Sequence, residues 1–359
     1  MKLDMKGETY IDFFYKKNSY FVGSASTALY IYIKHKKLYK EKILIPSNIC
    51  HSIPLSIVYS GNIPFFYDVN KVTGNPCIDS IKYVVSKDKV AAVVIPNMFG
   101  NVLGDRCLII DFLKFNNVLI IDDCAASLGA DMGYLLTSGD AAIFSFGENK
   151  HIDLNVGGVL ATNEVVDVLD INKEIKNTYE TSQYKVNLFN SIYKPIFYSD
   201  YYYQVLPLIN KVVDFFNDCY VFRYEWDEDK INELDKELNL LNKNKTLSLK
   251  KIKYLDEKIN FNSFVYERYE FSSGSNPWRY NILINDVNAK EKLIMRCLNE
   301  SIAISKWYPP IEPLFGSSPQ EGAVEFSKRV VNFNHMNLCW KKLDMIIDIL
   351  NAIGDEFDK

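Results

Sequence analysis

The chain has 359 residues, of which 48% are hydrophobic and 24% are charged, and this composition excludes a largely disordered protein. Its 41 basic and 45 acidic side chains give a formal net charge of -4, so there is no basic excess to hold a nucleic-acid backbone. No run of about 18 apolar residues is present, and no membrane span or membrane partner is predicted. At roughly 150 residues per domain, the length allows about two domains.

The first half of the chain contains six short apolar runs, each followed by a polar or helix-like segment. They cover residues 42–47, 63–69, 90–96, 117–123, 141–147 and 157–162. Continuous apolar runs are typical of strands that are buried on both faces. Helices are expected over 26–36 and 107–115 and from 165 onward. This alternation predicts an α/β fold with a mostly parallel central sheet between helices.

The second half changes in character after a strongly aromatic stretch at about 180–220, which we interpret as a helical or irregular connection. An amphipathic helix is expected over 229–259, a strand over 278–284, and helices over 288–299 and 341–353. We therefore predict a large α/β domain over residues 1–220 and a smaller α+β domain over residues 221–359.

The cysteines and the start of the chain bear on its location. The seven cysteines have no C-x-x-C spacing, so that neither a zinc site nor a disulfide framework is suggested. The first residues have no apolar core of a signal peptide. Free thiols and the lack of a leader predict a cytoplasmic protein. The four histidines have no metal-ligand spacing either, so no metal site is predicted.

The first segment with chemical potential is GSASTAL at residues 23–29. Gly23 allows a tight turn before a helix, and a helix N-terminus offers free N–H groups and a favourable dipole to a phosphate. Ser26 and Thr27 could add hydroxyl donors. The alternative is an ordinary helix cap. Neither a P-loop nor a GxGxxG pattern is present, so ATP and NAD are not favoured.

Two further segments carry ionisable groups. Asp122 and Asp123 end the buried run VLIIDD, and ligands of open α/β sheets bind beyond the carboxyl ends of the strands. A carboxylate there could bind a protonated ring nitrogen or cap a helix. Lys150 follows the run AAIFSFG in a polar loop and could form a Schiff base, although a solvated loop lysine is the alternative.

Together, these segments resemble the DegT/DnrJ/EryC1/StrS family of pyridoxal-phosphate enzymes, which are mostly sugar aminotransferases with the fold type I aminotransferase fold. The segments IIDDCAASLGA and FSFGENKHIDLNVGGVLATN resemble the family patterns I-E-D-A-A-Q-A-H-G-A and F-S-F-x-x-x-K-N…G-G-A-x-x-T-N. The segments ILIPSNICHSIPLSIVYSGNIPFFYDV and VVIPNMFG resemble two further family patterns, and the resemblance is strongest from residue 23 to residue 163.

The resemblance implies a role for each matching residue. Lys150 is the Schiff-base lysine, Asp123 pairs with the pyridinium nitrogen, and Ser145 adds a hydroxyl to the phosphate site. Ala25, Ser26 and Thr27 form the phosphate turn. Gly157 and Gly158 let the backbone pass close to the site.

The sequence departs from the family at several of these positions. Ala126 stands where the family has a Gln, and Cys50 aligns with the aromatic residue that stacks on the cofactor ring, with His51 as the alternative. The family loop that reaches into the neighbouring subunit has only Asn187 or Asn190 as a counterpart. The resemblance thus supports the cofactor more strongly than the usual substrate contacts.

Five residues are substrate candidates: His151, Arg279, Trp307, Tyr308 and His335. Arg279 could bind a carboxylate or phosphate with two parallel hydrogen bonds, or it could be a solvated strand residue. His151 could contact substrate or merely fill a position at which the family usually has Asn. His335 could contact substrate or be a surface histidine. The two aromatic residues could line the acceptor pocket or belong to the core.

The resemblance implies transfer of an amino group, with glutamate as the expected donor, to a nucleotide-linked keto-deoxy sugar in O-antigen, lipopolysaccharide or other surface polysaccharide biosynthesis. It also implies a homodimer with the active site at the interface. Three alternatives stay open. They are another pyridoxal-phosphate reaction (a dehydratase or a non-sugar aminotransferase), a non-catalytic protein with this fold, and a nicotinamide-dependent sugar-nucleotide enzyme.

Overall fold

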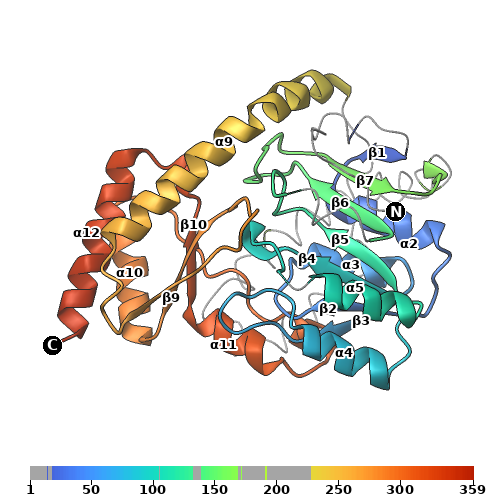
Figure 1. The fold of residues 1–359 in the computed structure, drawn as a ribbon, viewed down its shortest axis with the longest axis horizontal. Coiled ribbons are helices and arrows are strands. Elements are labelled where there is room, and N and C mark those ends of the chain that lie inside the picture. The colour runs from blue at the N-terminus through green and yellow to red at the C-terminus, as the bar shows by residue number, and fades with distance from the viewer. Residues whose placement is uncertain are drawn as a thin grey trace.

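The computed structural model describes residues 18–104, 106–131, 139–168 and 228–359, together with the single residues 14, 171 and 191. In Figure 1 a large sheet lies on the right, the C-terminal helices lie on the left, and one long helix runs along the top between them. The aromatic stretch at 180–220 and the predicted domain boundary at residue 220 fall almost entirely outside the described residues. The boundary therefore remains a prediction.

The large sheet has seven strands: β1 (Ser19–Val22), β2 (Lys42–Pro46), β3 (Ile63–Tyr67), β4 (Ala92–Pro96), β5 (Leu119–Asp123), β6 (Ala141–Ser145) and β7 (Gly158–Thr162). Their spatial order is β1-β7-β6-β5-β4-β2-β3. The five strands from β6 to β3 are parallel, whereas β7 is antiparallel to β6 and β1 is antiparallel to β7. The prediction of an α/β fold with a mostly parallel sheet is confirmed.

Four helices cover the two faces of this sheet: α2 (Ala25–His35), α3 (Ser52–Tyr59), α4 (Ile78–Lys87) and α5 (Arg106–Phe115). Along β2, Ile43 and Ile45 belong to the core that contains α2 and α3. Leu44, between them, belongs to the core that contains α4 and α5. Because consecutive strand residues point to opposite faces, a strand buried on both sides needs an apolar residue at every position. This explains the continuous apolar runs.

The sequence patterns missed several short elements, among them β1, α3 and α4. β1 has only four residues, too few to show a pattern. α3 has the sequence SIPLSIVY, which is rich in β-branched residues and contains Pro54 in its first turn, where proline is tolerated. Burial of Ile53, Leu55 and Ile57 stabilises this helix despite its poor intrinsic propensity.

The C-terminal region has four helices and a small sheet: α9 (Ile231–Lys258), α10 (Val287–Asn299), α11 (Glu321–Arg329), α12 (Trp340–Phe357), β8 (Tyr266–Arg268), β9 (Tyr280–Ile284) and β10 (Val330–Phe333). The three strands are antiparallel in the order β10-β9-β8. The predicted helices over 229–259, 288–299 and 341–353 and the strand over 278–284 lie within a few residues of α9, α10, α12 and β9. The strands β8 and β10 were not predicted from the sequence.

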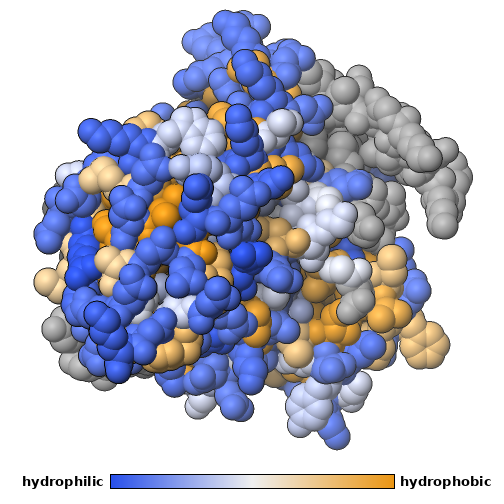
Figure 2. Space-filling view, turned by 60° about the vertical axis from the view of Figure 1, so that its left-hand side comes forward, coloured by the Kyte–Doolittle hydropathy of each residue, from blue (hydrophilic) through white to orange (hydrophobic). Residues whose placement is uncertain are grey.

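The helix α9 buries one stripe and leaves the rest of its surface polar. Leu234, Leu238 and Leu241 recur at helical spacing on its buried side. Figure 2 turns the C-terminal helices toward the viewer and shows a mostly hydrophilic face with hydrophobic side chains between the polar ones. Within the described residues, none of the helices combines the length and the apolar character needed to cross a membrane.

The C-terminal region is joined to the edge strand of the large sheet through Asp68. This residue directly follows β3, and its carboxylate accepts hydrogen bonds from the backbone N–H groups of Gly322 (2.8 Å) and Ala323 (3.0 Å) in the first turn of α11. A carboxylate is favourable at the positive end of a helix dipole. Nearby, the N–H of Ile311 donates to the carbonyl of Ser47, 2.8 Å away. Asp68 is therefore the cap of a helix that lies some 250 residues later in sequence.

Candidate active site

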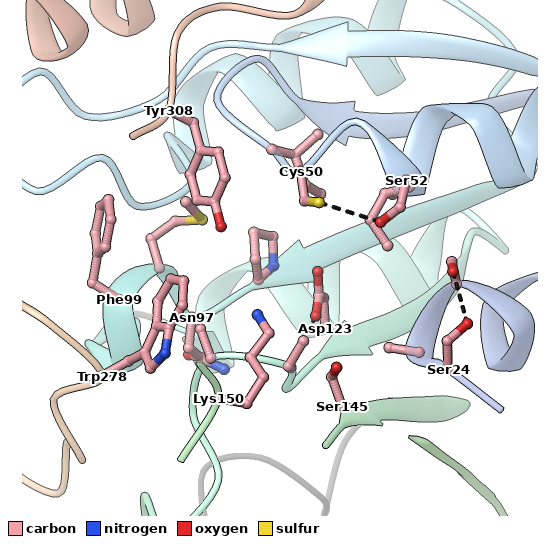
Figure 3. Close-up of a pocket in the computed structure, with 18 residues that line it drawn as sticks. Ser24, Cys50, Ser52, Asn97, Phe99, Asp123, Ser145, Lys150, Trp278 and Tyr308 are labelled. Atoms are coloured by element: carbon pink, nitrogen blue, oxygen red, sulfur yellow. Dashed lines mark hydrogen bonds between the residues drawn. The ribbon is translucent and has the colours of Figure 1, made fainter. Parts of the chain in front are cut away.

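A cavity of about 190 Å³ lies at the carboxyl ends of four adjacent parallel strands. Each strand contributes lining residues from its end or from the loop that follows: Cys50 after β2, Asn97 after β4, Asp123 in β5 and Ser145 in β6. Parallel strands end at the same edge of a sheet, which explains why residues far apart in sequence meet here. Figure 3 shows how these side chains converge.

Lys150 lies in the loop between β6 and β7, and its amine points into this cavity (Figure 3). The pKa of Lys150 is lowered, mainly by burial and to a smaller extent by the positive charge of Arg279. The negative charges of Cys50 and Asp123 raise the pKa and offset part of this lowering. The Nζ atom also lies 4.4 Å from the centre of the Trp278 ring. An amine whose pKa is lowered is a better nucleophile and proton acceptor at neutral pH.

The Asp123 carboxylate points into the same cavity as the Lys150 amine (Figure 3). Its Oδ1 atom accepts a hydrogen bond from the N–H of Ala125 at 3.0 Å, and no residue in the described ranges donates to its Oδ2 atom. Burial raises the pKa of Asp123, while the Ala125 N–H and the charge of Lys150 lower it. A buried carboxylate with a free oxygen is suited to a cationic N–H partner, such as a protonated ring nitrogen.

The N-terminus of α2 forms another wall of the cavity. Ser24 caps this helix: its hydroxyl accepts from the N–H of Thr27 at 3.1 Å and lies 2.9 Å from the hydroxyl of Ser26. Ser24, Ala25 and Ser26 line the cavity, whereas Thr27 is fully buried and does not. The N–H groups of a first helical turn have no acceptor within the helix, so those at this cavity wall are suited to an anion such as a phosphate.

Gly158 makes room for this helix N-terminus. A Cβ atom at Gly158 would lie 2.5 Å from the carbonyl carbon of Ser24 and 2.6 Å from the nitrogen of Ala25. Gly157 has a φ of 103°, and its N–H donates to the carbonyl of Gly23 at 2.8 Å. The glycine pair therefore lets β7 run directly against the turn that precedes α2.

The structure separates the two residues that were considered for stacking on a ring. Cys50 lines the cavity, and its sulfur lies 3.3 Å from the hydroxyl of Ser52. His51 is buried but is not among the lining residues. Ala126 also lines the cavity, so the position at which the family has Gln does face the site.

Three aromatic residues close the cavity on the side of the C-terminal region: Trp278, Tyr308 and Phe99. Phe99 has a left-handed backbone (φ 56°), and its ring stacks on Tyr308 with 6.3 Å between centroids. The sequence analysis did not single out Phe99, Asn97 or Ser24. Asn97 directly follows a predicted strand and Ser24 lies two residues before a predicted helix, but no pattern indicated that Phe99 would meet Tyr308.

The four remaining substrate candidates, His151, His335, Arg279 and Trp307, are not among the residues that line the cofactor cavity. His151 lines a second cavity of about 190 Å³ that also contacts Lys150, and burial lowers its pKa to about 4. His335 is fully buried, lies 2.7 Å from the Ser248 hydroxyl and lines neither cavity. The alternative of a surface histidine at position 335 is therefore wrong, because the side chain is fully buried.

Arg279 is a buried cation with few partners. Its guanidinium lies 4.6 Å from the ring centre of Trp278 and 4.2 Å from that of Trp307, and it donates one long hydrogen bond (3.4 Å) to Ser305. Its Nε atom has no hydrogen-bond partner, and no carboxylate of the described residues forms an ion pair with the side chain. The alternative of a solvated strand residue is wrong, because Arg279 is only 5% exposed. Asn187 and Asn190 lie outside the described residues.

The sheet topology is that of the fold type I aminotransferase fold. The solved structure of PseC, an aminotransferase from Helicobacter pylori, matches 95% of this chain and 88% of its own with a TM-score of 0.72 and 16% identity. The aminotransferase TlmJ from Streptoalloteichus hindustanus matches 95% and 87% with a TM-score of 0.72 and 16% identity. The predicted fold is confirmed.

The match to a sequence family covers less of the chain than the structural matches do, and it lies in the N-terminal half. Residues 8–172 match the model of the DegT/DnrJ/EryC1/StrS aminotransferase family, and the resemblance seen in the sequence is confirmed. GDP-perosamine synthase from Escherichia coli O157:H7 is 28% identical over 126 residues, 34% of each chain. The spore coat polysaccharide biosynthesis protein SpsC of Bacillus subtilis is 25% identical over 195 residues, 48% of this chain and 50% of its own. The match thus spans a third to a half of these curated relatives.

Proposed function

We propose that this protein is a pyridoxal-phosphate-dependent aminotransferase. The observation that carries the proposal is the convergence of the Lys150 amine, the Asp123 carboxylate and the N-terminus of α2 on one cavity. An amine, a carboxylate with a free oxygen and an anion-binding helix end are the three groups that the aldehyde, ring nitrogen and phosphate of this cofactor require. The residues present therefore fit the cofactor.

Pyridoxal phosphate, when bound, supplies an electron sink that stabilises negative charge at the α-carbon of an amino acid. Asp123 would hold the proton on the ring nitrogen, which keeps that sink effective. Ser24, Ser26 and the first N–H groups of α2 would hold the phosphate, with Ser145 at its other side. These contacts would fix the position of the reacting carbon relative to Lys150.

Lys150 would hold the cofactor and, when free, carry the proton that leaves and re-enters the α-carbon. Its lowered pKa supplies a neutral amine at a pH where an ordinary lysine is protonated. Arg279 would bind the donor's carboxylate, since a guanidinium pairs with carboxylates through two parallel hydrogen bonds and this one lacks such a partner. Trp278, Tyr308 and Phe99 would exclude water from the reacting atoms.

For the substrates, we propose glutamate as donor and a nucleotide-linked keto sugar as acceptor, in the synthesis of a surface polysaccharide. The support is the names of the relatives: two further GDP-perosamine synthases match, and so does dTDP-4-dehydro-2,3,6-trideoxy-D-glucose 4-aminotransferase of Saccharopolyspora spinosa. The expected homodimer and cytoplasmic location are part of the same proposal, and sedimentation analysis would test the dimer.

The first test is the colour of the purified protein. We expect a yellow absorbance after addition of pyridoxal phosphate, and we expect Lys150→Ala to abolish it. Lys245→Ala is the matched control, because Lys245 is also partly buried with a lowered pKa but lies outside the cofactor cavity. A wild-type protein that stays colourless would exclude the cofactor.

The second test separates an aminotransferase from the alternatives. Glutamate should bleach the yellow absorbance with release of 2-oxoglutarate, and a keto-sugar nucleotide should then restore it. A yellow protein that no amino acid bleaches would favour a non-catalytic role. Bleaching that only non-sugar ketones reverse would favour a different acceptor.

A further inference from the structure

The cofactor cavity contains a nucleophile to which the proposed reaction assigns no role. Cys50 lies in the loop between β2 and α3 and lines the cavity together with Lys150 and Asp123 (Figure 3). The residue is partly exposed, and the exposure is toward the space where the proposed cofactor would lie. The free Oδ2 atom of Asp123 independently marks that space as one for a ligand.

The surroundings of Cys50 favour its thiolate. Burial alone would raise its pKa, but the hydrogen bond and charge of His51, together with the hydrogen bonds of Ser52, lower the pKa to about 6. The thiolate and the Lys150 ammonium also attract each other across the cavity. The reactive form of a cysteine is the thiolate, and a low pKa combined with access identifies reactive thiols.

The other cysteines of the described residues lack this combination. Cys124 and Cys297 are buried, and burial raises the pKa of both thiols. Cys77 before α4 is partly exposed, and Cys107 on α5 and Cys339 before α12 are exposed, but these three line neither cavity. Among the described cysteines, only Cys50 both has a lowered pKa and lines a cavity that could hold a ligand.

We propose that Cys50 is a modification site at which hydroperoxides switch off cofactor binding. The thiolate sulfur attacks one oxygen of the hydroperoxide, an S–O bond forms as the O–O bond breaks, and the other oxygen leaves as hydroxide or alkoxide and takes up a proton. The sulfur loses two electrons to the peroxide and becomes a sulfenic acid. The added oxygen lies in the cavity and obstructs the cofactor ring, and a dithiol reductant restores the thiol.

The first arm of the test is alkylation, which does not depend on the proposed function. Chain without cofactor is treated with limiting iodoacetamide at pH 6, and the rate at each cysteine is measured by mass spectrometry. With a pKa of about 6, about half of the Cys50 thiol is thiolate at this pH, against roughly 0.3% of an ordinary thiol. A thiolate of lower pKa is also a weaker nucleophile, which reduces this advantage in rate by about tenfold. We expect Cys50 to react about tenfold faster than Cys107. Equal rates would overturn the proposal.

The second arm joins oxidation to cofactor uptake. Hydrogen peroxide should reduce the yellow absorbance that added pyridoxal phosphate produces, and dithiothreitol should restore it. In Cys50→Ser, peroxide should leave that variant's own uptake unchanged, whereas Cys107→Ser should remain as sensitive as the wild type. Equal peroxide sensitivity of Cys50→Ser and the wild type would overturn the proposal.

The two arms of the test distinguish failure of the proposed function from failure of the proposed switch. If untreated protein takes up no pyridoxal phosphate, the proposed function fails, and the alkylation rates still judge the reactivity of Cys50. If uptake is normal but insensitive to peroxide, the proposed function stands and the switch is wrong.

Discussion

The Nζ atom of Lys150 and the guanidinium of Arg279 both lie against the indole ring of Trp278, at 4.4 Å and 4.6 Å from its centre. Lys150 comes from a loop of the large sheet, and Arg279 precedes β9 of the C-terminal region. Both cations are thus held by one ring, and the charge of Arg279 lowers the pKa of Lys150. The C-terminal region therefore adds to the lowering of the pKa of Lys150, which is mainly due to burial.

We predict that Arg279→Met raises the pKa of Lys150, because it removes a positive charge that disfavours the ammonium form. Since the neutral amine is the active base, the acidic limb of the kcat profile should move to higher pH. The donor KM should also rise, by about 10- to 100-fold, with loss of a charged hydrogen bond. Arg279→Lys keeps the charge and should keep the position of the limb. An unmoved limb in Arg279→Met would contradict the coupling.

We predict that Asp123→Asn lowers kcat by about 100- to 1000-fold, because an amide cannot hold the positive charge of a protonated ring nitrogen. The matched control is Asp122→Asn. Asp122 points away from the cavity and forms a buried ion pair with Arg106. Its loss should lower the free energy of unfolding by about 3–5 kcal/mol, since it leaves a buried arginine unpaired. Chemical denaturation and single-turnover rates would distinguish the two, and similar kinetic losses in both variants would refute the assignment.

We predict that Gly158→Ala displaces the turn before α2, because the new methyl group would lie within 2.6 Å of Ser24 and Ala25 backbone atoms. Overpacking of this kind costs about 1–3 kcal/mol, and cofactor affinity should fall with it. Gly104→Ala is the control, since a Cβ there meets no atom within 4 Å. Thermal unfolding and absorbance titration measure the two effects, and equal behaviour of both variants would show that Gly158 is not constrained.

We predict that Ser24→Asp leaves the stability of α2 unchanged and weakens cofactor binding. Aspartate is a good helix N-cap, so α2 should stay stable, whereas Ser24→Ala should cost about 1 kcal/mol. The negative charge of Asp at this position would repel a phosphate at the same N–H groups. Cofactor titration of the folded variant should therefore show weaker binding. Binding as tight as in the wild type would place the phosphate elsewhere.

The sequence predicted the parts of this protein that depend on local patterns. Buried parallel strands leave continuous apolar runs, and strand ends collect at one edge, which made Asp123 and Lys150 candidates; the family resemblance, not the pattern, assigned their roles. The patterns could not show which side chains of α2 face the cavity, and they grouped Thr27 with Ser26 although Thr27 points into the core. Nor could they show that Phe99 meets Tyr308, because that contact depends on how the C-terminal region packs.

The hydrogen bonds from α11 to Asp68 have a consequence for the unfolding of the whole chain. Separation of the two regions would leave the carboxylate of Asp68 and the first N–H groups of α11 without each other as partners, and would also break the Ile311–Ser47 contact. We therefore expect one cooperative calorimetric transition for the intact chain, with equal van't Hoff and calorimetric enthalpies. Asp68→Ala should split it into two. Melting of the cofactor site and melting of the C-terminal helices would then become separate events.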